Sequence, residues 1–269
     1  MQTRMALIGF GEVGTTFARA AGWAQSATAW DIKPARKEEM VACGLRPAAD
    51  AAEALADAPL VLSFVTADGA EEAARDYAPL LSPGALWCDM NSVAPQTKLA
   101  AAEAIEAAGG RYVDVAVLAP VQPAGVAVPL LLAGPAAEEA EALLRLAGFT
   151  NARIIGAQVG QASAIKMIRS IMVKGIEALT AEMILAAEAA DVVDEVLASL
   201  DSSEKRICWT ERTDYNLERM ALHGVRRAAE MEEAAKTLAA LGVEPVMTNG
   251  TIRRQREMAG ILLRRKDCL

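Results

Sequence analysis

The first half of the chain alternates short apolar runs with stretches of helical periodicity. An uninterrupted apolar run is typical of a strand that is buried on both faces. Such strands, when they alternate with helices, predict a parallel sheet with helices on both sides. Strands are expected at 5–8, 27–30, 60–65, 85–89, 111–117, 128–133 and 152–155, and helices at 71–80, 97–108 and 136–146.

From Gly160 onward no strand pattern returns. Residues 161–190 contain one glycine, Gly175, and no proline, so they are expected to form a single helix of about 30 residues and roughly 45 Å. Further helices are expected at 191–200, 216–241 and 245–263. We therefore predict two domains, an α/β domain over 1–158 and an all-helical substrate and dimerisation domain over 159–269.

The long predicted helix is apolar on most of its surface. Such a helix must be buried on several sides, so we expect it to be the spine of the second domain and to pack against another copy of the chain in a homodimer or tetramer. Residues 115–137 are also uncharged and long enough to span a bilayer. Proline disrupts a spanning helix, so we expect two strands joined by a loop there, and no membrane partner. The prolines of this segment are Pro120, Pro123, Pro129 and Pro135.

A glycine-rich turn, Gly9-x-Gly11-x-x-Gly14, follows the first strand and opens a helix. Gly9 turns the chain sharply, Gly11 lets the backbone approach a diphosphate, and Gly14 lets the helix pack on the strand. The helix N-terminus adds N–H groups and a partial positive charge. The predicted fold is thus a Rossmann-type doubly wound parallel sheet followed by an all-α domain. The expected cofactor-binding residues of the turn are Gly9, Phe10, Gly11, Glu12, Val13 and Gly14.

Asp31 ends the second predicted strand, 22 residues after Gly9. A carboxylate at this point accepts the ribose 2′-OH of a dinucleotide and repels a 2′-phosphate. The predicted cofactor is therefore NAD. NADP stays open, because Lys33 and Arg36 bring positive charge to the same segment.

Composition limits the classes of binding partner and the cellular compartment that we expect. The 269 residues carry a net charge of −8, which disfavours nucleic acid as a partner. The four cysteines show no Cys-x-x-Cys spacing, and no signal peptide is expected before the first strand, so a reduced cytoplasm is the simplest compartment. No cluster of His, Cys and carboxylate residues has metal-ligand spacing, and no metal is expected.

Small and polar residues follow the predicted ends of three strands. Ligands of open parallel sheets bind beyond the carboxyl ends of the strands. We therefore expect Val65, Thr66 and Ser92 to contact the cofactor. Asn91 and Leu118 are expected near the substrate. Asn91 and Ser92 also suit a polar turn that caps the next helix, and both roles are compatible.

Four polar residues share one face of the long helix: Lys166, Arg169, Ser170 and Lys174, within an arc of about 140° at 100° per residue. Three cations there imply an anion nearby, either a substrate, a cofactor phosphate or an acidic side chain; the alternative is a solvated basic stripe. Lys166 follows the linker from the cofactor domain, which favours a place in the interdomain cleft. Removing hydride from an alcohol requires a base, and Lys166 with Ser170 is our candidate. Arg169 and Lys174 are candidates for binding substrate.

His223 is the single histidine of the chain and shares a helical face with Arg226 and Arg227. A lone histidine on a helix usually has a structural role. The alternative is that His223 and Arg227 contact an anionic substrate.

With these residues assembled, the chain resembles the β-hydroxyacid dehydrogenases, relatives of 6-phosphogluconate dehydrogenase and 3-hydroxyisobutyrate dehydrogenase. It looks closest to a bacterial branch with Gly-Phe-Gly-Glu in the first loop. The matching segments are 9–14, 89–95 (Asp-Met-Asn-Ser-Val-Ala-Pro) and 160–166 (Gly-Gln-Ala-Ser-Ala-Ile-Lys). The resemblance implies that Lys166 is the general acid/base and that Ser92 lies beside the nicotinamide ribose.

Two positions depart from the family pattern. Ser170 stands where the family usually has asparagine, and its side chain is shorter. The family's substrate loop appears here as Asp-Val-Ala-Val-Leu-Ala-Pro over 114–120, which lacks a hydroxyl and has no N–H at Pro120. This loop suggests a bulkier or less polar substrate than a small acid.

The expected function is an NAD(P)-dependent oxidoreductase that transfers hydride between nicotinamide and a hydroxy acid or related secondary alcohol. One alternative is imine reduction on the same fold, against which the retained Lys166 counts. A second alternative, supported by the altered loop, is an NAD(H)-binding module without catalysis.

Overall fold

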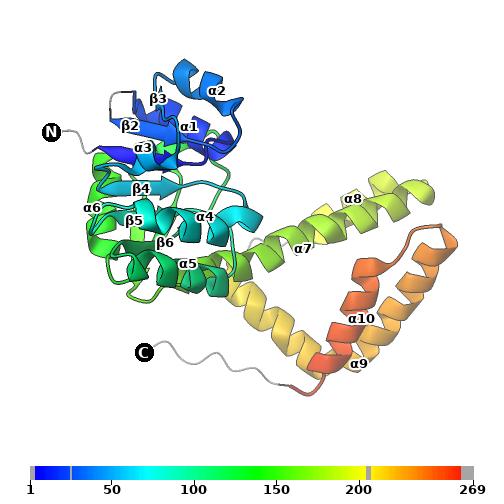
Figure 1. Cartoon of the computed structure of the whole chain (residues 1–269). Helices are drawn as coiled ribbons and strands as arrows, with labels where there is room; N and C mark the ends of the chain where they lie inside the picture. The colour runs from blue at the N-terminus through cyan, green and yellow to red at the C-terminus, as the bar shows by residue number, and fades with distance from the viewer. Residues whose placement is uncertain (1–3, 25, 204–206, 262–269) are drawn as a thin grey trace. The chain divides into compact units, whose positions relative to one another are not determined.

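The computed structural model describes residues 4–24, 26–203 and 207–261 (Figure 1). The chain divides into two compact units, Met1–Ser170 and Ile171–Leu269, and the division falls inside helix α7 (Gln161–Ala189). The predicted continuous helix over 161–190 is thereby confirmed. The predicted boundary between residues 158 and 159 stays a prediction about which segment folds independently.

The described part of the first unit contains an eight-stranded sheet with the order β3-β2-β1-β4-β5-β6-β7-β8. β1 is central and pairs in parallel with both β2 and β4, which is the doubly wound arrangement predicted from the sequence. The strands are β1 (Met5–Ile8), β2 (Ala27–Trp30), β3 (Arg46–Pro47), β4 (Leu60–Ser63), β5 (Leu86–Asp89), β6 (Arg111–Val117), β7 (Leu130–Ala133) and β8 (Ala152–Gly156).

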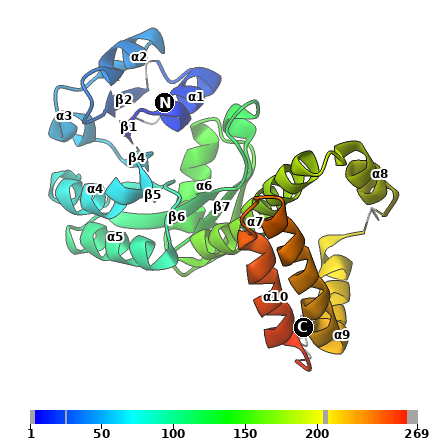
Figure 2. The same ribbon diagram turned by 90° about the vertical axis from the view of Figure 1, so that its right-hand side faces the viewer.

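Alternate residues of β1 face two different hydrophobic cores. Met5 and Leu7 pack on one side with α1 and α6, whereas Ala6 and Ile8 pack on the other with α3, α4 and α5. Helices therefore cover both faces of the sheet, as Figure 2 also shows. Their bounds are α1 (Glu12–Ala21), α2 (Arg36–Ala42), α3 (Ala51–Leu55), α4 (Ala70–Tyr77), α5 (Pro95–Ala107) and α6 (Ala137–Leu146).

The predicted doubly wound parallel sheet is confirmed, and one pair of its strands, β6 and β7, is antiparallel. A parallel return needs a crossover, which is usually an α-helix. The connecting residues 118–129 contain only a short 3₁₀ turn, Gly125–Ala127. β7 therefore runs back beside β6, and the predicted pair of strands joined by a loop is confirmed. No helix among the described residues is long and apolar enough to cross a membrane.

Strand register brings the loops that follow β1, β2, β4 and β5 to one edge of the sheet. Ile8 pairs with Trp30 on one side and with Ser63 on the other. Ser63 in turn pairs with Asp89. The residues that follow these strands, which include the glycine-rich turn, Asp31 and Asn91, therefore share the edge where ligands of such sheets bind.

The second unit is helical throughout its described residues. It contains the remainder of α7, α8 (Val193–Ser203), α9 (Trp209–Ala240) and α10 (Val246–Met258). α9 and α10 lie side by side (Figures 1 and 2). The carboxylate of Glu182 on α7 accepts hydrogen bonds from the backbone N–H groups of Met247 and Thr248, at 2.6 and 2.8 Å. A side chain of α7 thus caps the N-terminus of α10.

Candidate cofactor and active site

The glycine-rich turn is shaped by close backbone contacts. Gly9 has φ +87°, and a Cβ on it would lie 2.8 Å from the carbonyl carbon of Phe64, so only glycine fits. A Cβ on Gly14 would approach the carbonyl O of Gly9 to 3.2 Å. At Gly11, by contrast, a Cβ would meet no atom of the described chain within 4 Å. The space beside Gly11 is therefore open to a ligand that contacts the backbone.

The N-terminus of α1 lies at this turn. Gly11 is the N-cap residue and has no side chain, so the N–H groups of the first helical turn receive no side-chain cap. Glu12 is exposed and Val13 is partly buried, whereas the side chain of Phe10 is fully buried in the core. Uncapped N–H groups at the positive end of a helix suit a diphosphate.

Asp31, at the end of β2, uses both carboxylate oxygens. Oδ2 accepts a hydrogen bond from the N–H of Phe10 at 2.7 Å, and Oδ1 accepts one from the N–H of Lys33 at 2.8 Å. A carboxylate has about four acceptor sites. Asp31 can therefore accept two further hydrogen bonds, as a ribose diol requires, while it holds the glycine-rich turn against β2.

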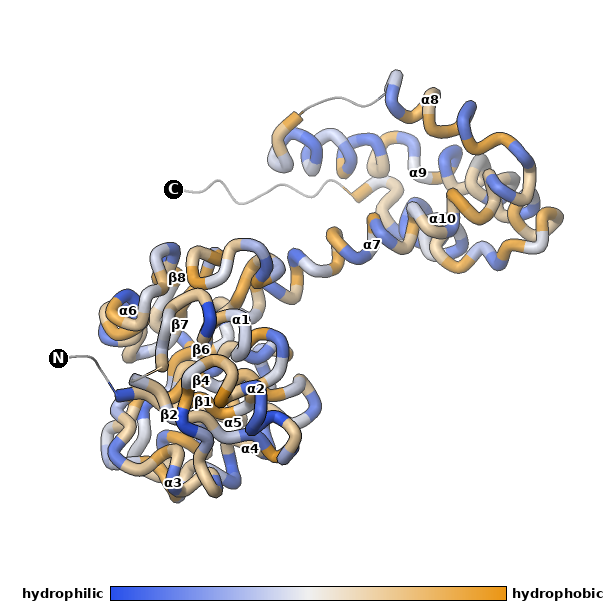
Figure 3. Tube along the Cα trace, turned by 90° about the horizontal axis from the view of Figure 1, so that it is seen from above, coloured by the Kyte–Doolittle hydropathy of each residue, from blue (hydrophilic) through white to orange (hydrophobic). Residues whose placement is uncertain are grey.

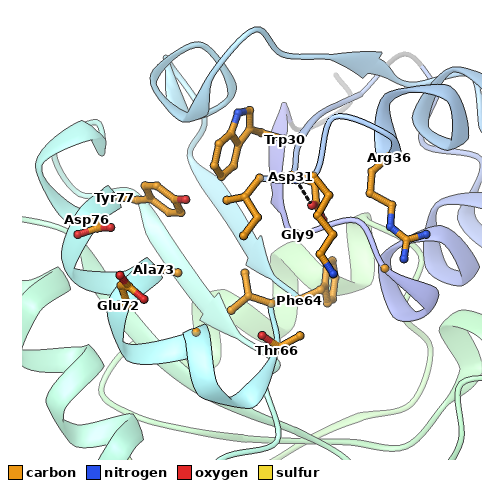
Figure 4. A pocket seen from close by; sticks show the side chains of 15 residues that line it. Gly9, Trp30, Asp31, Arg36, Phe64, Thr66, Glu72, Ala73, Asp76 and Tyr77 are labelled. Atoms are coloured by element: carbon orange, nitrogen blue, oxygen red, sulfur yellow. Dashed lines mark hydrogen bonds between the residues drawn. The ribbon is translucent and has the colours of Figure 1, made fainter.

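A cavity of about 330 Å³ opens beside Asp31 and the turn (Figure 4). Trp30 and Tyr77 contribute to its wall, with their rings edge to face and the centroids 5.3 Å apart. Burial and the nearby charges of Asp76 and Asp31 raise the pKa of the Tyr77 phenol, so it stays neutral at pH 7. The size and the aromatic wall suit the base and ribose of a nucleotide.

Two cations border this cavity. Lys33 is exposed. Arg36 donates hydrogen bonds from Nη1 to both carboxylate oxygens of Glu39, at 2.8 Å each. The positive charge of Arg36 is therefore paired with a carboxylate of its own helix, α2.

Lys166 and Ser92 meet at the carboxyl edge of the sheet. Ser92 follows β5, and Lys166 lies in the second turn of α7. The Nζ of Lys166 donates a hydrogen bond to the Oγ of Ser92 at 2.5 Å, although the two residues are 74 positions apart. Both residues belong to the first unit, the one that carries the glycine-rich turn.

Asn91 is buried next to Ser92, with 5% of its surface exposed. Its Nδ2 donates to the Oγ of Ser63 at 3.0 Å. Its Oδ1 has no hydrogen-bond partner within the described chain. An unpaired buried acceptor costs about 1–3 kcal/mol. This oxygen is itself buried within the chain and is not open to a ligand.

The other residues predicted at this edge of the sheet lie partly beside the nucleotide cavity and partly beside α7. Val65 and Thr66 line the cavity beside Asp31. Leu118 is partly buried and packs against a small cluster that includes Ala162 at the start of α7. Leu118 thus lies on the α7 side of the edge, whereas Val65 and Thr66 lie on the nucleotide side.

The candidates on the helices are dispersed. The hydroxyl of Ser170 donates to the carbonyl O of Lys166 at 2.8 Å, so its proton is used within the helix. Arg169 is exposed in the first unit. Lys174, His223 and Arg227 belong to the second unit, where Lys174 and His223 are exposed and Arg227 is partly buried.

A buried charged cluster beneath this edge was missed in the sequence analysis. The Nζ of Lys98, on α5, is 3.0 Å from Oδ1 of Asp89 and 3.5 Å from Oδ1 of Asp114, and all three side chains are at least 99% buried. The phenol of Tyr112 donates to Oδ2 of Asp89 at 2.5 Å. Burial, the charge of Asp89 and this hydrogen bond raise the pKa of Tyr112 well above its ordinary value. The available signal was Asp114 itself, a carboxylate inside a buried strand, which requires a partner.

Among the described residues, no group of three His, Cys, Asp or Glu side chains is placed to hold a metal ion. The open space at Gly11, the uncapped α1 N-terminus and the free acceptor capacity of Asp31 all fit a dinucleotide. The first unit is thus a dinucleotide-binding domain by fold and by site.

Comparison with known proteins agrees with this class. Residues 4–156 match the family model described as the NAD binding domain of 6-phosphogluconate dehydrogenase. Residues 187–258 match a domain of unknown function, DUF1932. Because the first match covers more than half of the chain, the protein belongs to the 6-phosphogluconate dehydrogenase-like family of NAD-binding proteins. The predicted family and the predicted nicotinamide cofactor are confirmed.

Three solved structures are similar to this chain over most of its length. A conserved hypothetical protein from Sinorhizobium meliloti 1021 is 37% identical, with TM-score 0.63 over 95% of this chain and 88% of its own. The conserved protein MTH1747, described as structurally similar to 3-hydroxyacid dehydrogenases, is 30% identical, with TM-score 0.62 over 95% and 96%. An imine reductase from Myxococcus stipitatus in complex with NADP⁺ is 18% identical, with TM-score 0.75 over 94% and 93%, and shows the shared fold.

Proposed function

We propose that this protein is an NAD(P)-dependent oxidoreductase that transfers hydride between nicotinamide and the carbinol carbon of a hydroxy acid or related secondary alcohol. Lys166 is its general acid/base. The hydrogen bond from Lys166 to Ser92 carries the proposal, because it holds an amine at the sheet edge that also carries the glycine-rich turn. The similarity of MTH1747 to 3-hydroxyacid dehydrogenases supports the same chemistry.

The chain's residues have separate roles in this reaction. When bound, nicotinamide accepts hydride from the alcohol at its C4 atom. Lys166 takes the hydroxyl proton through Nζ and returns it in the reverse direction. Ser92 holds that amine in place, and Asn91 supports the loop that carries Ser92 through its hydrogen bond to Ser63. Ser170 stabilises the helical turn that carries Lys166 by donating a hydrogen bond to the carbonyl O of Lys166.

The expected substrate region has few hydrogen-bond donors and one cation close to Lys166. Leu118 is partly buried, and the two residues after it, Ala119 and Pro120, are exposed and bring no polar side chain. Arg169 lies one turn after Lys166 and is exposed, so it is our candidate for an anionic group of the substrate in this unit. Lys174, His223 and Arg227 remain candidates from the second unit. We expect a hydroxy compound with a sizeable apolar part.

The same residues keep imine reduction as the second candidate. The apolar Leu118 region offers little to a carboxylate, and the protein shares its fold with an imine reductase over most of its length. The retained Lys166 counts against this candidate. A cofactor-binding module without catalysis is the third outcome that an assay must distinguish.

A dehydrogenase screen tests these three functions. The full chain is assayed with NAD and NADP separately on 3-hydroxy acids, aldonic acids and aromatic hydroxy compounds, and with NADH and NADPH on cyclic imines. Oxidation of at least one hydroxy compound supports the proposal. Turnover of imines alone overturns it in favour of imine reduction, and bound cofactor without any turnover favours the non-catalytic module.

We further propose NAD as the preferred cofactor. The Asp31 carboxylate is fixed at the ribose end of the cavity by two backbone N–H groups. Glu39 pairs with Arg36, the cation best placed for a 2′-phosphate. Three carboxylates, those of Asp31, Glu72 and Asp76, line the cavity against the two cations Lys33 and Arg36. Negative charge therefore outweighs positive charge there, which favours a free 2′-OH.

We also propose that a second copy of the chain covers the helical unit. Among described residues 171–203 and 207–261, the buried apolar side chains are those of Ala187, Ala228 and Ile252, which is too small a core for a stable domain. Along α7, by contrast, large apolar side chains are exposed, and Ile171 is 75% exposed. Figure 3 shows that hydrophobic residues recur along α7. A stable dimer buries roughly 800 Å² on each partner. The exposed residues of this apolar face, within an arc of about 140° at 100° per residue, are Ile165, Ile168, Ile171, Met172, Ile176 and Leu179.

A further inference from the structure

The start of α7 is held by a carboxylate from the sheet. Oδ2 of Asp114, on β6, accepts hydrogen bonds from the backbone N–H groups of Gly160 and Ser163, at 3.1 and 2.9 Å. The hydroxyl of Ser163 donates to the same oxygen at 2.9 Å. A helix normally receives such a cap from a residue next to its first turn. Here the cap comes from 46 residues earlier, so it fixes the helix to the strand as well as satisfying its N–H groups.

Lys98 joins this cap to the loop after β5. Its Nζ donates to the carbonyl O of Asp89 at 2.6 Å and is 3.0 Å from Oδ1 of the same residue. It is also 3.5 Å from Oδ1 of Asp114. The contact with Asp114 is an ion pair, since Oδ1 of Asp114 has no hydrogen-bond partner among the described residues. Lys98 thus links the end of β5 to the middle of β6.

The contacts form a closed ring around the proposed base. Oδ1 of Asp89 accepts the N–H of Asn91 at 2.8 Å, which fixes the loop that carries Ser92. From Asp89 the ring passes through Lys98 and Asp114 to the first turn of α7. Lys166 then closes it with its hydrogen bond to Ser92. Each end of the Lys166–Ser92 contact is thus fixed to the same buried lysine.

Stability alone does not account for this arrangement. Apolar residues of similar volume often stabilise a core as well as a buried ion pair or better, because the charges must be desolvated. The cluster here consists of two carboxylates and one ammonium, and therefore carries a net negative charge inside the domain. Unlike an apolar core, the cluster fixes the relative orientation of backbone segments, because each of its hydrogen bonds joins one segment to another.

We propose that Asp114 and Lys98 are positioning residues that hold the amine of Lys166 against Ser92. This inference rests on the proposed function of Lys166, because a position matters only if that amine transfers the proton. Displacement of a reacting group by about 1 Å can cost about 10²-fold in rate. Loss of the ring is therefore expected to lower kcat and to leave dinucleotide affinity unchanged, since the glycine-rich turn is fixed separately by Asp31.

The test compares Asp114→Asn with Asp50→Asn in the full chain. Asp50 caps α3 by accepting from the N–H of Glu53 at 2.8 Å. Its variant therefore also removes the charge of a helix-capping carboxylate, but has no link to Lys166. Acetic anhydride labels lysine amines, and mass spectrometry gives the labelling rate of Lys166 relative to Lys174. We expect Asp114→Asn to raise that ratio severalfold and Asp50→Asn to leave it at the wild-type value. An unchanged ratio in a folded, NADH-binding Asp114→Asn protein overturns the proposal.

Two further measurements keep the result decisive. If Asp114→Asn does not fold, Lys98→Gln replaces it, which removes the charge that faces Asp114 and keeps a donor on the side chain. A raised labelling ratio supports the proposal and an unchanged ratio overturns it. With a substrate from the screen, Asp114→Asn is expected to lower kcat by up to about 10²-fold in the wild-type chain, and to have no further effect once Lys166 is alanine. Full activity of Lys166→Ala would refute the proposed function, whereas the labelling ratio tests the ring without any substrate.

Discussion

The Asp31 carboxylate accepts the backbone N–H of Phe10 at 2.7 Å, which joins the end of β2 to the middle of the glycine-rich turn. One residue thereby shapes the diphosphate site and supplies the acceptor for the ribose. Its second oxygen is held by the N–H of Lys33 at 2.8 Å. The carboxylate cannot swing away from an incoming 2′-phosphate without releasing the turn, so cofactor choice and turn geometry are coupled.

Removing Glu39 should increase the affinity for NADPH. In Glu39→Ala the guanidinium of Arg36 loses its carboxylate partner and is released toward the cavity that it borders. We expect the Kd for NADPH to fall about tenfold, or about 1.4 kcal/mol, and the Kd for NADH to stay unchanged, both measured by fluorescence titration. Glu38→Ala removes the same charge from α2 at an exposed position and is the control. Equal effects of the two substitutions would show that Arg36 does not reach the ribose.

A methyl group on Gly11 should block the cofactor and leave the fold intact. Its Cβ would meet no atom of the described chain within 4 Å, so Gly11→Ala creates no clash in the protein. The methyl group would instead occupy the space of the diphosphate. We expect calorimetry to show NADH affinity reduced by at least about tenfold, with an unchanged melting temperature. Gly175→Ala, equally unobstructed but on α7, should keep full affinity. Wild-type affinity in Gly11→Ala would place the diphosphate elsewhere.

Most of the fold was predictable because its signals are local. The apolar runs of β1, β4 and β5 and the glycine-rich turn each identify an element without knowledge of the rest of the chain. The short elements β3, α2 and α3 were missed, since two to seven residues carry too little periodicity. The direction of β7 depends on a loop without a crossover helix, which strand patterns alone do not reveal.

The site was predictable in part for the same reason. The cavity-lining positions Asp31, Val65 and Thr66 follow from where strands end. The buried Lys98 was not identified, because its partners Asp89 and Asp114 lie on other elements and a lysine beside an alanine-rich run looks like an exposed helical residue. Charge pairs between residues that are far apart in the chain cannot be identified from one sequence.

Glu182 should make the helical unit less stable in acid. Burial by itself raises the carboxyl pKa of Glu182, but hydrogen bonds from Thr248 and from backbone N–H groups outweigh it and lower the pKa below 4.5. The stabilisation is therefore fully present above pH 4.5 and is lost as pH falls through the lowered pKa. Glu182→Gln should accelerate hydrogen exchange in α10 at pH 7 by an amount equivalent to about 0.5–2 kcal/mol.

The control for that substitution is Glu177→Gln, an exposed position of the same helix, which should leave exchange in α10 unchanged. The difference between wild type and Glu182→Gln should shrink in acid, because the wild-type carboxyl is then protonated as well. A difference that stays constant from pH 7 to below the lowered pKa would mean that the cap does not depend on the charge of Glu182.

A charge on the apolar face of α7 should dissociate the assembly. Light scattering on the wild-type chain is expected to give at least twice the chain mass of 28.3 kDa. Ile171→Glu places a carboxylate at a 75% exposed position of that face and should reduce the mass to that of one chain. Val41→Glu, at a 62% exposed position on α2, should not. A wild-type mass of 28.3 kDa at every concentration would contradict the dimer.

The central claim is that Lys166 transfers the proton while nicotinamide, bound over the glycine-rich turn, transfers hydride. It is tested most directly by kcat for Lys166→Met on the best hydroxy compound of the screen, with the Kd for the cofactor measured on the same sample. The account predicts that kcat falls by about 10²- to 10⁴-fold and that the Kd stays at the wild-type value. Wild-type kcat in Lys166→Met, on a chain that still binds the cofactor, would contradict it.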